Sequence, residues 1–122
     1  MLEVLLNTPA GGRVAARLFA AEETLHAPHL LDIEVTQVLR RYALSGDLKP
    51  ERGLLALEDL ADLPLIRYPH GVFLPRIWEL RHNVTAYDAV YLALAEALAV
   101  PLVTRDAALA SAPGHSARIE LI

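Results

Sequence analysis

Cysteine is absent from this chain of 122 residues, and so is any long apolar run. Without cysteine, neither a disulfide framework nor a thiolate metal site can form. Asp88, Glu96 and Pro101 interrupt the most apolar stretch, which argues against a transmembrane helix. The N-terminus has no basic lead and carries Glu3, so no signal peptide is predicted and we expect a cytoplasmic protein with no membrane partner.

Positive charge is also scarce. The formal net charge is −4, with 11 lysines and arginines against 15 acids. This balance gives no general reason to expect nucleic-acid binding, so such binding would depend on local arginines or on a metal. The sequence contains no nucleophile elbow, phosphate loop or dinucleotide fingerprint. Metal-ligand spacing is also lacking among the five histidines, which are His26, His29, His70, His82 and His115.

What the sequence does contain is a regular alternation of short apolar strands and amphipathic helices. Apolar residues make up 54% of the chain, which is long enough to bury a core, so we predict one domain over residues 1–122. The alternation is typical of a doubly wound α/β fold with a mostly parallel sheet flanked by helices. Expected helices cover about 9–21, 30–44, 50–60, 70–80, 85–99 and 107–110, and expected strands cover 24–27, 65–68, 102–104 and 119–122.

The stretch from Thr85 to Asp106 organises the sequence. Apolar residues at helical spacing predict a helix that Thr85 caps and Pro101 ends, followed by a buried strand. Asp88 falls in the first turn of this helix, and Asp106 lies just past the strand. Helix N-termini and strand C-termini share one edge of a parallel sheet, where ligands bind. We therefore expect the two acids to lie on one rim.

A third acid, Glu34, borders the buried face of its predicted helix. Each acid has a structural alternative, since Asp88 has capping-box spacing with Thr85 and Asp106 could cap the turn that follows it. Glu34 could complement a helix dipole, with Asp32 as the cap. Clustered together, the three carboxylates would repel one another unless a divalent cation or a proton neutralised them. Oxygen ligands without cysteine favour Mg²⁺ or Mn²⁺ over Zn²⁺.

Three stretches carry a family resemblance: residues 27–41 (APHLLDIEVTQVLRR), 80–89 (LRHNVTAYDA) and 102–106 (LVTRD). Together they resemble the PIN-domain family, and especially its VapC-type toxin ribonucleases. The resemblance covers nearly the whole chain. It implies a PIN fold, cleavage of single-stranded or tRNA-like RNA with Mg²⁺ or Mn²⁺, a cognate antitoxin protein that blocks the site, and a homodimer.

Four acids form the centre in that family. The resemblance matches the later three to Glu34, Asp88 and Asp106, and it matches Thr104 to the hydroxyl residue that precedes the last acid. It implies that Asp88 and the first acid hold the metal that activates water, and that Glu34 and Asp106 orient this metal or position a second one.

The family's first strand, which ends in the first acid, has no counterpart in the sequence as given. The sequence begins within the helix that follows this strand, and Glu3 lies about one helical turn past the expected acid. Two interpretations stay open: the start lies further upstream, or the chain is a truncated and inactive relative.

Candidate RNA contacts are few, so weak and local RNA binding is expected. We expect Trp78, Tyr87 and Tyr91 to be core aromatics and not base-stacking platforms. Four arginines are candidate phosphate contacts, although each is also explained as a solvated surface charge: Arg40, Arg41, Arg81 and Arg105.

Two other function classes are compatible with parts of the pattern. A phosphoacceptor receiver domain also has an acidic Mg²⁺ site, but it needs a lysine after the last strand, and the only lysine here is Lys49. The other alternative is a catalytically inactive PIN-like module that only binds an antitoxin.

Overall fold

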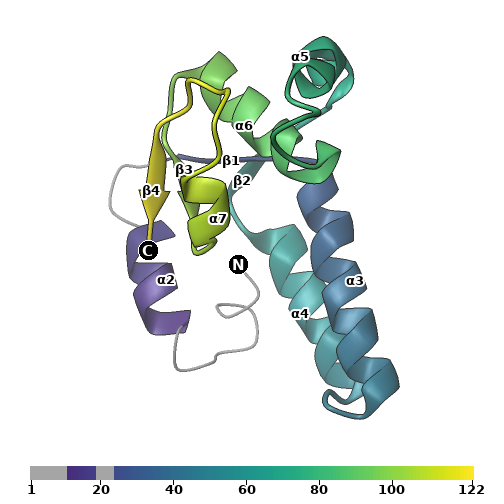
Figure 1. Cartoon of the computed structure of the whole chain (residues 1–122). Coiled ribbons are helices and arrows are strands. Elements are labelled where there is room, and N and C mark those ends of the chain that lie inside the picture. Colours follow the sequence, from purple (N-terminus) through teal and green to yellow (C-terminus); the bar gives the residue numbers. More distant parts are fainter. Residues whose placement is uncertain (1–10, 19–23) are drawn as a thin grey trace. The chain divides into compact units, whose positions relative to one another are not determined.

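A computed structural model describes residues 11–18 and 24–122, which fall into two compact units, residues 1–66 and residues 67–122. The predictions for residues 1–10 and for a helix end near Ala21 lie outside the described residues. Figure 1 shows the elements, which are α2 (Gly11–Leu18), β1 (Leu25–Pro28), α3 (Leu30–Ser45), α4 (Pro50–Asp62), β2 (Leu65–Tyr68), the 3-10 helix η1 (Gly71–Phe73), α5 (Leu74–Glu79), α6 (Ala86–Leu98), β3 (Leu102–Thr104), α7 (Ala107–Ala110) and β4 (Ile119–Leu121).

The unit of residues 1–66 is built on the antiparallel pair of α3 and α4, which lie side by side (Figure 1). Gly46 ends α3 in the left-handed region at φ 83°, where glycine is not strained, and Pro50 starts α4 at a position that needs no N–H. The pair buries Val35, Leu39, Ala56 and Leu60 between its helices. The predicted bounds of both helices are confirmed to within two residues.

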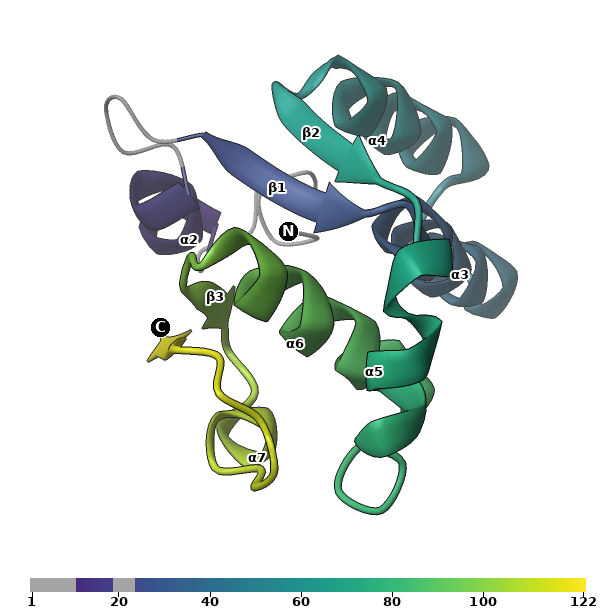
Figure 2. The ribbon, with the colours of Figure 1, turned by 90° about the horizontal axis from the view of Figure 1, so that it is seen from above.

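The unit of residues 67–122 is built around α6, which lies beside α5 (Figure 2). Thr85 caps α6, and its last turn closes at Ala99, as predicted. Six residues of α6 are buried because the helix is apolar on most of its surface. Ala89 and Leu92 of α6 form a buried core cluster with Leu80, which precedes α6, and with Leu109 of α7.

The described strands form two two-stranded sheets, β1 with β2 and β3 with β4. The pair of β3 and β4 is parallel, with Leu102 opposite Ile119 and Thr104 opposite Leu121. This confirms the expected α/β class with parallel strands. A single sheet was expected, but within residues 11–18 and 24–122 no strand joins the two pairs.

The prediction of core aromatics is wrong for two residues. Trp78 is 68% exposed and Tyr87 is 63% exposed, whereas Tyr91 is half-buried. On the short helix α5, Ile77 and the following Leu80 pack into the core, so the intervening Trp78 is directed away from it. No helix in the described part of the chain is both long and apolar enough to cross a bilayer.

Candidate functional site

Asp88 occupies the first turn of α6 with its carboxylate unengaged. Its backbone N–H donates to Thr85 Oγ1 at 3.2 Å, which is one half of the predicted capping box. The other half is not formed, because the Asp88 carboxylate makes no hydrogen bond or ion pair with any described residue. The side chain is half-buried. Capping therefore explains Thr85, but it does not account for an acid at Asp88.

Asp106 combines a structural contact with a free oxygen. Its Oδ1 accepts hydrogen bonds from Ala108 N at 2.9 Å and Leu109 N at 3.2 Å, so the predicted cap of α7 is formed. Its own N–H donates to Thr104 Oγ1 at 3.0 Å. Among the described residues nothing bonds Oδ2. One carboxylate oxygen thus fixes the side chain while the other stays available.

The two acids line one pocket of about 490 Å³ within residues 67–122. Asp88 lies in the first turn of α6 and Asp106 follows the end of β3, so helix α6 and strand β3 separate them in the sequence. The fold brings both to one pocket, as expected for one rim of a parallel α/β unit. The pocket's other polar residues are Arg81, His82, Asn83 and Thr85. His82 and Asn83 were not singled out from the sequence; their only signal is their place just before the Thr85 cap.

Glu34 lies in the other unit, half-buried on α3. The cap of α3 is His29, without a side-chain cap bond, and Asp32 lies inside the first turn. The prediction of Asp32 as the cap is therefore wrong: α3 starts earlier, which lets Leu31 pack against the core. Across residues 11–18 and 24–122, no group of three or more histidines and acids is placed to hold one ion.

The candidate arginines differ in their surroundings. Arg81 lines the pocket of the two acids. Arg105 is exposed between Thr104 and Asp106 but does not line the pocket. Arg40 and Arg41 are exposed on α3.

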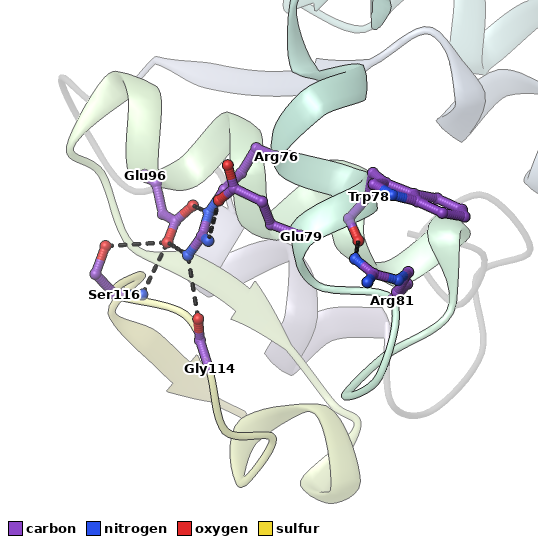
Figure 3. A network of polar contacts seen from close by, with 7 residues as sticks. All are labelled: Arg76, Trp78, Glu79, Arg81, Glu96, Gly114 and Ser116. Carbon is purple, nitrogen blue, oxygen red and sulfur yellow. Dashed lines mark hydrogen bonds and ion pairs between the residues drawn. The ribbon is translucent and has the colours of Figure 1, made fainter.

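A polar network that sequence reasoning missed supports this region (Figure 3). Arg76 donates from Nε and Nη2 to the two carboxylate oxygens of Glu96, each at 2.9 Å, and Nη2 also donates to Gly114 O at 3.1 Å. The Glu96 Oε2 accepts from both N–H and Oγ of Ser116, at 2.8 and 3.0 Å. Arg76 further pairs with Glu79 at 2.9 Å. The network joins α5, α6 and the loop that leads to β4.

Glu96 is an acid near the end of an otherwise apolar helix, and its side chain is only 13% exposed. The hydrogen bonds from Arg76, followed by those from Ser116, lower the pKa of Glu96 to about 2 against the opposing effect of burial. A lone carboxylate on the buried side of a helix requires a partner. Glu96 in its apolar helix was therefore the one sequence feature that could have pointed to this network.

Comparison with known proteins gives a consistent result. The PIN domain family matches residues 1–114. Ribonuclease VapC1 of Mycobacterium tuberculosis is 48% identical over 113 residues, which cover 89% of this chain and 83% of the relative. Ribonuclease VapC12 of the same organism is 41% identical over 121 residues, covering 99% and 92%. Ribonuclease VapC9 is 48% identical over 91 residues, covering 75% and 72%.

Proposed function

This chain belongs to the PIN-domain family, and on that premise we propose that it is a toxin endoribonuclease that hydrolyses RNA phosphodiester bonds. In this proposal residues 1–122 act as one PIN-like domain, and a cognate antitoxin protein neutralises the activity. The receiver-domain alternative is dropped, because the family match covers residues 1–114.

One observation carries the proposal: Asp88 and Asp106 line the same pocket, and each keeps carboxylate oxygen that no described residue bonds. Two acids at one pocket repel each other unless a cation neutralises them. Folding has therefore placed carboxylate oxygens without a protein partner at a cavity open to a ligand, which is the property expected of a cation site.

The donor chemistry fits Mg²⁺ or Mn²⁺, since carboxylate oxygens are the ligands these hard cations prefer. Asp88 and Asp106 would hold the metal, and Glu34 is proposed as a further acid of the site. When bound, the metal supplies charge neutralisation at phosphorus and an activated water. Thr104 has a positioning role, since its Oγ1 holds the backbone N–H of Asp106.

RNA contacts would come from arginines, because the chain has a net charge of −4 and no broad basic face is expected. Arg81 is the strongest candidate because it lines the acid pocket. Arg40, Arg41 and Arg105 are exposed and are proposed as weaker phosphate contacts. We also propose a homodimer, and a cytoplasmic site of action, where RNA substrates are found.

The test is cleavage of a single-stranded RNA by the purified chain with Mg²⁺, with Mn²⁺ and with a chelator. We expect metal-dependent cleavage that is lost in Asp88→Asn. The matched control is Asp59→Asn, which removes an exposed acid of α4 and should cleave like the wild type. Thermal melting of each variant shows that the loss is not due to unfolding.

Three outcomes would contradict the proposal. Equal cleavage with the chelator would remove the metal from the mechanism. Retained cleavage in Asp88→Asn would place the chemistry elsewhere. No cleavage by a folded chain that still binds its antitoxin would favour the inactive binding module.

A further inference from the structure

Trp78 is the only tryptophan of the chain, and its side chain is 68% exposed. Packing does not require it there, since Ile77 and Leu80 already fill the core side of this region. An exposed indole is well suited to bind a partner, because it offers a flat apolar face together with one polar N–H. The surroundings of the ring indicate which partner.

Arg81 is held against this ring. Its guanidinium carbon lies 4.8 Å from the ring centroid, and its Nη1 donates to Trp78 O at 3.0 Å (Figure 3). No described residue forms an ion pair with Arg81, whereas Arg76 is neutralised by two acids. Of the five N–H donors of an arginine, one is used here. Arg81 is therefore a preorganised cation with donors to spare.

The same Arg81 lines the pocket of Asp88 and Asp106. The stacked pair thus extends from the wall of that pocket to the exposed indole. No described residue forms an ion pair with this guanidinium, although two acids line the same pocket, and it lies over Trp78 instead. The arrangement keeps the positive charge available to an anionic ligand that enters the pocket.

Resting on the proposed ribonuclease function, we propose that Trp78 and Arg81 together bind an unpaired nucleotide next to the cleavage site. The base stacks on the indole, and the free N–H groups of Arg81 bond a phosphate of the same strand. Aromatic rings and arginine planes are the usual platforms for splayed bases, and a base inside a duplex has no free face. The pair would therefore make the enzyme selective for unpaired RNA.

A protein partner is the other possible occupant of an exposed tryptophan. The structure favours RNA because an arginine with no ion-pair partner among the described residues lies over the ring and also lines the pocket of Asp88 and Asp106. A second copy of the chain then becomes an outcome of the test.

Because Trp78 is the sole tryptophan, its fluorescence reports on this position directly. A short single-stranded oligoribonucleotide is titrated into the full chain in chelator, so that no cleavage occurs. We expect saturable quenching, and much weaker quenching by the same oligonucleotide annealed to its complement. Equal quenching by both forms would overturn the selectivity for unpaired RNA.

Variants are compared by the anisotropy of a labelled oligoribonucleotide. Trp78→Ala should weaken binding about fivefold to a hundredfold, as loss of one stacked base does, and Trp78→Phe should weaken it by less than about threefold. The matched control is Val72→Ala, which shortens a side chain that is 79% exposed on η1 but carries no ring. Unchanged affinity in Trp78→Ala, or an equal loss in Val72→Ala, would overturn the proposal.

Light scattering separates the alternatives. If Trp78→Ala changes the oligomeric state but not the RNA affinity, the ring contacts a second copy and the inference is wrong. The proposed nuclease function fails separately, through absence of metal-dependent cleavage, while the binding measurements in chelator remain valid.

Discussion

Arg76 and Glu96 are joined by two parallel hydrogen bonds of 2.9 Å, from Nε to Oε1 and from Nη2 to Oε2. This bidentate geometry is among the strongest ion-pair arrangements. Because Arg76 also bonds Gly114 O and Glu96 also bonds Ser116, the pair anchors the loop between α7 and β4 to the two helices.

The first prediction concerns the pH dependence of stability. The folded pKa of Glu96 is lowered from 4.5 to about 2, so its contribution is fully present above pH 4.5 and is lost as the pH falls towards 2. We expect Glu96→Gln to lower the free energy of unfolding by about 2 kcal/mol at neutral pH, after allowing for solvent screening at Arg76. The difference in free energy of unfolding between Glu96→Gln and the wild type should decrease as the pH is lowered from 4.5 to 2.

Urea unfolding across this pH range measures the effect. Glu79→Gln is the matched control, because Glu79 also pairs with Arg76 but its side chain is 64% exposed. We expect this variant to lower the free energy of unfolding by less than about 0.5 kcal/mol. A constant difference between Glu96→Gln and the wild type down to the lowest pH would show that the ion pair is not responsible.

The second prediction concerns Gly114, which has φ 92°. A Cβ added there would collide with the Asn83 side chain, whereas a Cβ at Gly46, with φ 83°, would meet nothing. We expect Gly46→Ala to lower the free energy of unfolding by about 1 kcal/mol through backbone strain, and Gly114→Ala to lower it somewhat more, because the exposed Asn83 side chain must also rotate away. Thermal unfolding of the two variants compares them.

A double variant separates strain from clash. In an Asn83→Ala background, Gly114→Ala should cost about as much as Gly46→Ala, because the obstructing amide is gone. If the cost of Gly114→Ala were the same with and without the Asn83 side chain, the clash would play no part.

Much of the local fold followed from residues whose effect is short-range. The Thr85 cap, the Gly46 turn and the Pro50 start act within one helical turn, so the sequence alone located the ends of α3, α4 and α6. The likeness to a known family supplied the rest of the architecture. These short-range rules failed where more than one residue could begin a helix. Asp32 was predicted to cap α3 but lies inside the helix, which begins two residues before it.

Long-range contacts could not be predicted in this way. Whether Trp78 is buried depends on which face of the short helix α5 packs against the core. Arg76 and Glu96 are 20 residues apart, and no sequence pattern links them. The joint placement of Asp88 and Asp106 was expected from sheet topology, and both line one pocket. The assignment of these acids as metal ligands, together with Glu34, stays a prediction.

The third prediction concerns Thr104. Its Oγ1 accepts the Asp106 N–H, so Thr104→Val should leave that donor unpaired and lower the free energy of unfolding by about 1 kcal/mol. RNA cleavage should fall about tenfold because Asp106 is less well fixed. Thr104→Ser retains the hydroxyl and should restore most of the activity in the same cleavage assay. Equal losses in both variants would indicate that the methyl group matters and not the hydrogen bond.

The fourth prediction separates the two roles of Asp106. An asparagine oxygen can still accept from Ala108 and Leu109, so Asp106→Asn should melt like the wild type, whereas Asp106→Ala should lose about 1 kcal/mol with the cap of α7. Both variants remove the charge that a metal requires, so both should lose metal-dependent cleavage. Melting curves and cleavage rates are measured on the same preparations. Full activity in Asp106→Asn would restrict Asp106 to capping, because the oxygen that holds α7 would then be the only part of the side chain that the protein needs.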